Sequence, residues 1–320
     1  MPVSRVARTR LVVVVAVAAA AVATACAEPR ETTPTLAAFN EAAWTPPREA
    51  DIPADSMGAS IRRGLYLLRF TPESLPTYAP GGMRCTSCHQ EDGLKATAAP
   101  LTGSHSRFPK YMPRSGAVIT LADRVNYCIT RSLAGSVLPV GSREMTDMLA
   151  YFAFISRDVP VGAKMAGANG LISMKDTLVG DAARGRAKYE TTCVVCHLAD
   201  GAGNGAIPPL WGPRSYSIGA SMSREERAAS FISHNMPQTA PGTLTAQESF
   251  DLAAYINSHP RPDSPGKEND WPMGGAPKDV PYATPGHEPY RAPASLVPRA
   301  RPADAVVPNP RTARGEKGMK

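Results

Sequence analysis

The chain has 320 residues, of which 43% are hydrophobic and only 6% are aromatic, and its formal charge is +7. This length allows two ordinary domains with appendages, and this hydrophobic content excludes a wholly disordered chain. A basic chain suits an anionic substrate, an acidic protein or an anionic surface. No basic and aromatic interleaving and no binding motif accompany the charge, so we expect no nucleic-acid partner.

The first 26 residues have the three parts of a secretory signal. Three arginines precede an apolar run over residues 11–22, and small residues then lead to Cys26. The run is too short for an ordinary membrane-spanning helix of about 20 residues. We therefore expect export to the periplasm or to the outer face of the cytoplasmic membrane, with a flexible segment over residues 27–55. Cys26 is either a lipid anchor, the one membrane attachment we expect, or part of a plainly cleaved signal.

The rest of the chain contains the same order of elements twice. Apolar residues at three- and four-residue steps predict short helices at 61–68 and 183–189. Similar patterns predict closing helices near 147–152 and 251–256, the second of which begins with a capping box over residues 245–248. We therefore predict an all-α fold made of two copies of one module.

The predicted first domain covers residues 56–158 and the predicted second domain residues 181–260. Residues 159–180 contain several glycines and no strong period, which is typical of a linker. Residues 261–320 form a tail too rich in proline to sustain helices. Aromatic residues can pin the first half of this tail against the domains, and we expect disorder from about residue 291. These aromatic residues are Trp271, Tyr282 and Tyr290.

Each domain contains one Cys-x-x-Cys-His run, namely Cys85-Thr-Ser-Cys88-His89 and Cys193-Val-Val-Cys196-His197. In such a run the two thiols add to the vinyl groups of haem, and the adjacent histidine reaches the iron from one face. A thioredoxin-like redox pair would need an α/β context, and a zinc half-site would need two more ligands nearby. The repeated motif therefore predicts two covalently bound haem c groups in two tandem cytochrome c-like domains.

In the second domain, Met236 is the expected ligand on the opposite face of the haem. It precedes a proline in a loop between a helix that ends near His234 and the closing helix. A capping box over residues 223–226 is expected to start that first helix. Met222 and His234 are rival ligands, and the alternative for any methionine is simple core filling.

The first domain offers a different ligand. Between Pro113 and Gly141 there is no Met, His or Lys, and Cys128 is the only good iron ligand. His105 and Met112, which lie before this segment, are alternatives, and a lone buried cysteine is usually a small hydrophobe.

A helix that starts at Thr120 would align Arg124, Cys128 and Ser132, with Arg131 beside the thiol. Two flanking guanidiniums would favour the thiolate, and with the iron they would form a pocket for an anion. Surface ion pairs are the alternative for each arginine, and solvation of the helix is the alternative for the serine.

With these residues together, the chain resembles the dihaem thiosulfate dehydrogenases, also called tetrathionate synthases, over about residues 58–290. The most specific stretches are Arg84–His89, Arg107–Arg114, Val118–Leu121, Cys128 with Arg131-Ser132, Pro208–Gly212, Asn235–Pro237 and Asn257-Ser258.

In that family the first haem is the active site with His/Cys ligation, and the second has a Met-containing ligation and passes electrons outward. The resemblance implies His89 and Cys128 at the catalytic haem, and His197 and Met236 at the relay haem. The positions thought to hold thiosulfate are Arg114, Arg124 and Ser132. Some members have a lysine before the methionine as an alternative ligand, whereas this chain has Asn235.

The implied reaction joins two thiosulfates into tetrathionate and releases two electrons to a soluble cytochrome or a similar acceptor. Arginines suit it because cationic donors offset the repulsion between two dianions. Our hypothesis is that Cys128 leaves the iron, or bonds transiently to a substrate sulfur, during turnover. The same site would also serve tetrathionate reduction.

Three other functions fit parts of the pattern. A non-catalytic dihaem electron carrier would gain nothing from an anion pocket. A SoxA-like cytochrome would join thiosulfate to a carrier protein and need a separate small cytochrome subunit. A dihaem peroxidase would need one haem to open for peroxide, which no sequence feature requires.

Overall fold

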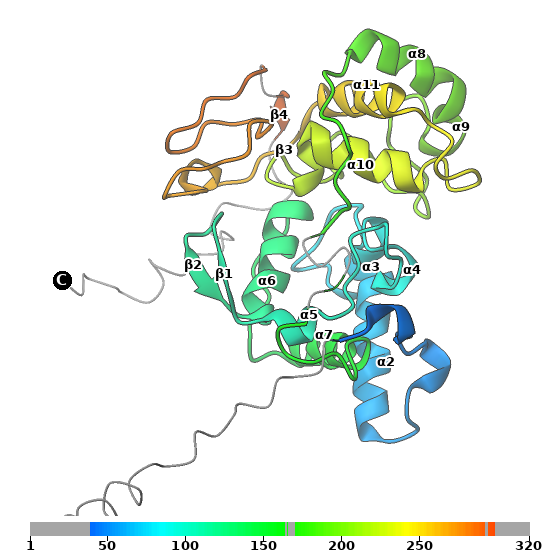
Figure 1. Ribbon diagram of the computed structural model, residues 1–320, viewed down its shortest axis with the longest axis vertical. Coiled ribbons are helices and arrows are strands. Elements are labelled where there is room, and N and C mark those ends of the chain that lie inside the picture. Colours follow the sequence, from blue (N-terminus) through cyan, green and yellow to red (C-terminus); the bar gives the residue numbers. More distant parts are fainter. Residues whose placement is uncertain (1–38, 164, 166–169, 292–293, 298–320) are drawn as a thin grey trace, which may run out of the picture. The chain divides into compact units, whose positions relative to one another are not determined.

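The computed structural model describes residues 39–163, 165, 170–291 and 294–297 (Figure 1). The predicted signal, Cys26 and the last part of the tail lie outside the described residues. The helices of the first half are α2 (Ser56–Arg69), α3 (Thr71–Ser74), α4 (Gln90–Gly93), α5 (Ser104–Arg107), α6 (Leu121–Tyr127) and α7 (Arg143–Phe154). Those of the second half are α8 (Ala182–Thr192), α9 (Val194–His197), α10 (Glu225–Asn235) and α11 (Ala246–Asn257).

Two short strand pairs, one antiparallel and one parallel, accompany the helices. The first pairs β1 (Lys110–Met112) with β2 (Ala117–Ile119) in antiparallel register, and the second pairs β3 (Arg261–Pro262) with β4 (Leu296–Val297) in parallel. The all-α expectation is confirmed, since both folding units are built from helices. The strands are local additions that the periodicity did not predict.

A close helix crossing organises the first domain, in which α2 packs on α7. Gly64 permits the crossing, because a Cβ atom there would lie 2.1 Å from the Asp147 carbonyl oxygen. The Asp147 carboxylate is held by Arg63, whose Nε lies 2.7 Å away. Ser142 caps the N-terminus of α7 by accepting a hydrogen bond from the Met145 N–H.

The second domain repeats this crossing with α8 and α11. A Cβ atom on Gly185 would lie 1.9 Å from the Asp251 carbonyl oxygen, and Arg184 Nε binds the Asp251 carboxylate at 2.7 Å. The predicted capping box of Thr245 and Glu248 is present at the start of α11. The two domains therefore share one packing device as well as one order of elements.

The predicted capping box at residues 223–226 is wrong. The Ser223 hydroxyl donates to the Ile218 and Ala220 carbonyls, and α10 begins two residues later at Glu225. A carboxylate from the tail takes over the capping position, because Asp279 accepts a hydrogen bond from the Glu226 N–H at 3.0 Å.

The first part of the tail is packed rather than loose. Trp271 and Tyr282 are 8% and 5% exposed and form a small core with Ile218 and Val280. Tyr290, by contrast, is 54% exposed. Along the described part of the chain, no helix has the length and apolar character that crossing a membrane requires.

Candidate functional site

The first Cys-x-x-Cys-His run forms a tight turn in front of α4. Cys85–Ser87 is a 3-10 turn, and the Cys85 N–H donates to the Thr71 hydroxyl at 3.1 Å. His89 Nδ1 lies 2.5 Å from the Ala99 carbonyl oxygen. A histidine fixed through Nδ1 leaves Nε2 for a metal, which is the usual arrangement around haem iron.

Cys128 faces this run from the end of α6. A π-helical turn over Cys128–Ser132 follows α6, and the Cys128 thiol lies within hydrogen-bonding reach of His89 and interacts electrostatically with Cys85 and Cys88. Arg124 Nη1 lies 3.2 Å from Cys128 Sγ. The four side chains that a His/Cys-ligated haem c would use therefore meet at one place.

The thiols of this site differ in their electrostatics. Burial raises the pKa of the Cys85 thiol to about 11 and that of Cys88 to about 12. Burial also acts to raise the pKa of Cys128, but Arg124 and His89 outweigh it and lower the pKa to about 7. Cys128 is thus the thiol that its surroundings favour as a thiolate.

The second run lies in a cavity of about 510 Å³. Cys193, Cys196 and His197 line the cavity, and His197 Nδ1 lies 3.2 Å from the Pro208 carbonyl oxygen. The remaining lining is largely apolar, as a flat hydrophobic cofactor requires. These residues fit a covalently attached haem c.

The methionine candidates also lie at this cavity. Met236, the first residue after α10, lines it, and so does Met222. His234 is held by the Ser230 carbonyl at 2.8 Å. At the first site, His105 is exposed and Met112 lies in β1, while Cys128 is the side chain in contact with His89.

The two sites adjoin. Ser87 and Cys88 of the first run line the cavity that contains the second run. Asn235, which precedes Met236, is fully buried and its Nδ2 donates to the Thr97 carbonyl at 3.0 Å. The Thr97 hydroxyl donates back to Asn235 Oδ1 at 2.8 Å. The Asn235 amide therefore joins the segment that carries Met236 to the loop that orients His89.

Arg114 and Arg131 have a partner that the sequence pattern did not suggest. Asp270, from the tail, is 1% exposed and binds Arg114 Nε at 2.9 Å and Arg131 Nη2 at 2.6 Å. Tyr282 donates to the same carboxylate at 2.8 Å. Arg131 therefore does not flank the Cys128 thiol as we expected, and the charge of Arg114 is already compensated. Ser132 ends the π-helical turn.

Two cations that sequence reasoning did not select lie near Arg124. They are Arg107, at the end of α5, and Lys110, at the start of β1. Both interact electrostatically with Arg124. In the sequence, these two residues stand out as basic residues of the stretch Arg107–Arg114. That stretch does not show where their side chains lie in the folded protein.

Arg261 supplies a further test of whether a cofactor fits. Its side chain is 0% exposed and lies over the Tyr216 ring, and Tyr216 lines the cavity of the second run. Its Nε and Nη1 have no hydrogen-bond partner among the described residues. A buried guanidinium with free donors needs an anion, and haem carries two propionate carboxylates.

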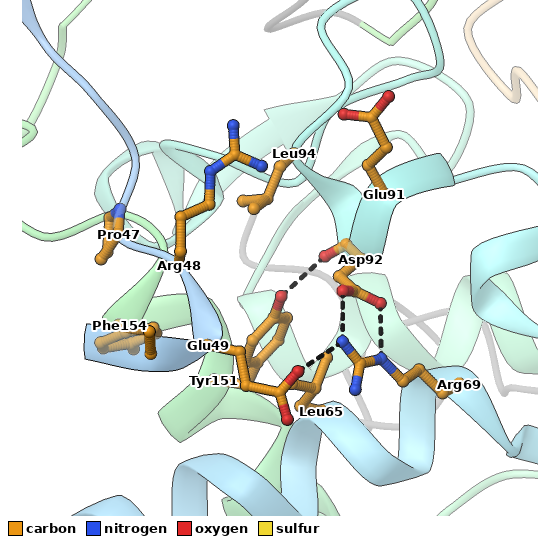
Figure 2. Close-up of a pocket in the computed structure, with 11 residues that line it drawn as sticks. Pro47, Arg48, Glu49, Leu65, Arg69, Glu91, Asp92, Leu94, Tyr151 and Phe154 are labelled. Atoms are coloured by element: carbon orange, nitrogen blue, oxygen red, sulfur yellow. Dashed lines mark hydrogen bonds and ion pairs between the residues drawn. The ribbon is translucent and has the colours of Figure 1, made fainter. Parts of the chain in front are cut away.

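A separate cavity of about 380 Å³ lies under the N-terminal segment of the first domain. Figure 2 shows the Arg69 guanidinium between the Asp92 and Glu49 carboxylates, and the Tyr151 hydroxyl donating to the Asp92 carbonyl. The charges of Arg69, Asp92 and Glu49 are already paired, and neither Cys-x-x-Cys-His run lines the cavity. The cavity therefore belongs to the packing of the domain.

Two family models match the chain. Residues 77–161 match "SoxA/TsdA, cytochrome c domain", and residues 180–256 match "Cytochrome C oxidase, cbb3-type, subunit III". Both are cytochrome c domains, so the chain binds haem c covalently.

Curated relatives resemble most of the chain. A thiosulfate dehydrogenase from Allochromatium vinosum is 40% identical over 72% of this chain and 87% of the relative. One from Psychrobacter arcticus is 38% identical over 73% of each chain. A solved thiosulfate dehydrogenase (TsdBA) from Marichromatium purpuratum is 33% identical with a TM-score of 0.66, over 71% of this chain and 51% of that one. This chain therefore spans about half the length of the solved relative.

Proposed function

Because the chain belongs to the thiosulfate dehydrogenase family, we propose that it is a dihaem cytochrome that oxidises two thiosulfates to one tetrathionate. Its electrons would leave through the second haem site to a soluble cytochrome or a similar acceptor. The observation that carries the proposal is the Cys128 thiol, paired with Arg124 and placed opposite His89 and the first pair of cysteines.

In the proposed active site, Cys85 and Cys88 would hold the haem, and His89 and Cys128 would ligate its iron. Haem c bound at each site would accept and release single electrons. Arg124 stabilises the negative charge of the Cys128 sulfur and lies where an anionic substrate must approach it. The Ala99 carbonyl accepts a hydrogen bond from His89 Nδ1, which fixes the tautomer of this histidine.

Arg114 has a different role in this proposal from the one that the resemblance implies. Its guanidinium donates to Asp270 and to the Gly219 carbonyl, and it stacks 4.9 Å from the Trp271 ring. We infer that Arg114 holds the wall of the site in place, while Arg124 supplies the positive charge beside the reacting sulfur. Ser132 remains a proposed substrate contact.

The relay site is proposed to use His197 and Met236 as ligands and Cys193 and Cys196 for attachment. Two observations support its task. Ser87 and Cys88 of the first run line its cavity, so the two cofactors would lie close together. On the other side, Val195 is 80% exposed, which brings the second run to the surface where an acceptor can dock.

We also propose that the protein works in the periplasm or on the outer face of the cytoplasmic membrane. The charged, apolar and small-residue order of the first 26 residues supports export. Cys26 would be the membrane anchor if it is lipidated.

Purified protein loaded with haem is the material for the test. Thiosulfate is added with an excess of a one-electron acceptor, and acceptor reduction and tetrathionate formation are followed together. The wild type should form one tetrathionate for every two electrons delivered, because the reaction forms one sulfur–sulfur bond. Cys128→Met should keep both haems, which are attached elsewhere, and lose most of the turnover.

The control is the haem content of each preparation, measured from its absorption spectrum after denaturation. Tetrathionate formation by the wild type but not by Cys128→Met assigns catalysis to the first site. A fully loaded wild type that forms no tetrathionate would remove the proposed activity and leave an electron carrier.

A further inference from the structure

Three cations, one each from α5, β1 and α6 of the first domain, form a cluster, and one of them contacts Cys128. Arg107 ends α5, Lys110 opens β1 and Arg124 lies in α6. Lys110 interacts electrostatically with both arginines, and Arg107 with Arg124. Arg124 in turn contacts the Cys128 sulfur at 3.2 Å. The cluster therefore extends outward from the thiol.

The strand pair turns Lys110 toward this cluster. Side chains alternate along a strand, and Tyr111, the next residue, is 51% exposed while Lys110 is half-buried. Lys110 also lies opposite Ile119, which is 1% exposed. Cross-strand partners point to the same face, so Lys110 lies on the buried face of the ribbon.

Among the described residues, these cations lack acidic partners. Arg107 Nε donates to the Gly103 carbonyl at 3.2 Å, and the Lys110 ammonium lies 5.2 Å from the Phe108 ring centroid. Across residues 39–163 and the other described stretches, no carboxylate forms an ion pair with Arg107, Lys110 or Arg124.

Like charges in partly buried positions are unfavourable without an anion. Burial lowers the pKa of Arg107, and Arg124 lowers it further. Burial, Arg107 and Arg124 lower the pKa of Lys110 in the same way. Arg114 and Arg131 differ, because both pair with the Asp270 carboxylate. Among the described residues, the cluster of Arg107, Lys110 and Arg124 has no such carboxylate to offset its charge.

We propose that Arg107 and Lys110 form a second oxyanion subsite, which binds the sulfonate group farther from Cys128. This inference rests on the proposed function and names the residues for its second substrate molecule. One thiosulfate would place its outer sulfur at Cys128 beside Arg124, and the other would be held by Arg107 and Lys110.

The chemistry requires such a subsite. Two thiosulfate dianions lose two electrons in total and form one sulfur–sulfur bond, with no proton taken up or released. The product keeps one sulfonate at each end. Cations at two separate positions reduce the repulsion as the dianions approach and hold both ends of the product.

The test measures equilibrium binding of tetrathionate to the oxidised, haem-loaded protein by calorimetry, without an electron donor. The double variant Arg107→Gln/Lys110→Gln should bind tetrathionate roughly tenfold or more weakly, because charge-assisted contacts are lost. The thiosulfate KM should rise by a similar factor while kcat changes less.

The matched control is Lys175→Gln/Arg214→Gln, which removes the same charge from two exposed positions. Control binding equal to that of the wild type, with weak binding by the Arg107/Lys110 variant, supports the subsite. Equal binding by both double variants overturns it. A wild type that binds tetrathionate through Arg107 and Lys110 but forms none from thiosulfate refutes the proposed function and leaves the subsite standing.

Discussion

At the residue scale, Arg261 and Asn235 are two buried side chains that lie next to the proposed haem sites. Arg261 is completely buried and two of its nitrogens lack partners among the described residues. Its donated hydrogen bond to the Ile256 carbonyl, at 2.7 Å, fixes the guanidinium but does not balance its charge. A nearby haem carboxylate would balance it.

Replacing Arg261 with glutamine should therefore lower a haem reduction potential. A positive charge beside a haem stabilises the added electron, so its removal favours the oxidised state. Spectroelectrochemical titration measures the change, with Arg214→Gln as the control at an exposed arginine. Identical potentials in all three proteins would show that Arg261 does not face a haem.

Asn235 differs from Arg261 in that it carries no charge. Its amide links two loops of the protein. Besides Thr97, its amide binds the Phe231 carbonyl at 3.0 Å, so all of its described contacts are made inside the protein. Replacing Asn235 with alanine should reduce the free energy of unfolding by about 1–3 kcal/mol, because the half-buried hydroxyl and carbonyl of Thr97 lose their partner.

Chemical denaturation of haem-loaded protein measures this loss, and Asn269→Ala is the exposed control. The absorption band of methionine-ligated haem iron should weaken as well, because Met236 is the next residue. An unaltered band together with unaltered stability would contradict the linking role.

At the scale of elements, the duplicated helix crossing carries most of the packing that the two domains share. Gly64 and Gly185 allow backbone contact, and each follows an arginine that pairs with an aspartate of the facing helix. Alanine at either glycine should destabilise its domain by about 1–3 kcal/mol, since the added methyl group has no room.

Thermal unfolding of Gly64→Ala and Gly185→Ala provides the measurement. Gly141→Ala is a matched control, because a Cβ atom there would meet nothing within 4 Å. If all three variants unfold at the same temperature, the close approach of the helices does not depend on glycine at positions 64 and 185.

The same crossings predict a response to acid. Burial acts to raise the pKa of the Asp147 and Asp251 carboxyls, but Arg63 and Arg184 outweigh it and keep both pKa values below the usual range. Lowered folded-state pKa values stabilise the protein fully above the ordinary aspartate range, near pH 4, and this stabilisation is lost as the pH falls through the folded-state values.

Unfolding measured between pH 7 and pH 3 should therefore show a smaller pH dependence for Asp147→Asn and Asp251→Asn than for the wild type. Asp176→Asn, at an exposed position of the linker, is the control. A pH dependence that neither variant reduces would exclude these two carboxyls as its source.

Elements set by neighbouring residues were predictable from the sequence, and those set by distant ones were not. Thr245 and Glu248 form their capping box because both partners lie within one turn. Ser223, in the similar pattern before α10, instead donates its hydroxyl hydrogen bond to the Ile218 carbonyl. The start of α10 is capped by Asp279, which lies 53 residues from Glu226 in the sequence. Likewise the contact of Arg124 with Cys128 follows from helical spacing, whereas the pairing of Arg131 with Asp270 spans 139 residues.

At the scale of the whole molecule, the tail connects the two domains through Asp270 and Asp279. Asp270→Asn should destabilise the protein by about 3 kcal/mol, because it leaves two largely buried guanidiniums without their counter-charge. Burial and Arg114 already lower the pKa of Arg131.

Denaturation of haem-loaded protein tests this, with Asp263→Asn as a control at a carboxylate that pairs with a lysine on its own segment. Equal stability of the two variants would show that the fold does not need the Asp270 carboxylate to offset the repulsion between Arg114 and Arg131.

The position of Asp270 in the sequence also determines when the ion pairs of Arg114 and Arg131 can form. A chain that crosses a membrane from its N-terminus delivers residues 114 and 131 long before residue 270. If the chain is exported as we propose, the nascent first domain would hold two repelling guanidiniums during this interval and would acquire their anion only after the second domain has crossed. A chain cut short before residue 270 would keep both attachment motifs and lack a finished active-site wall.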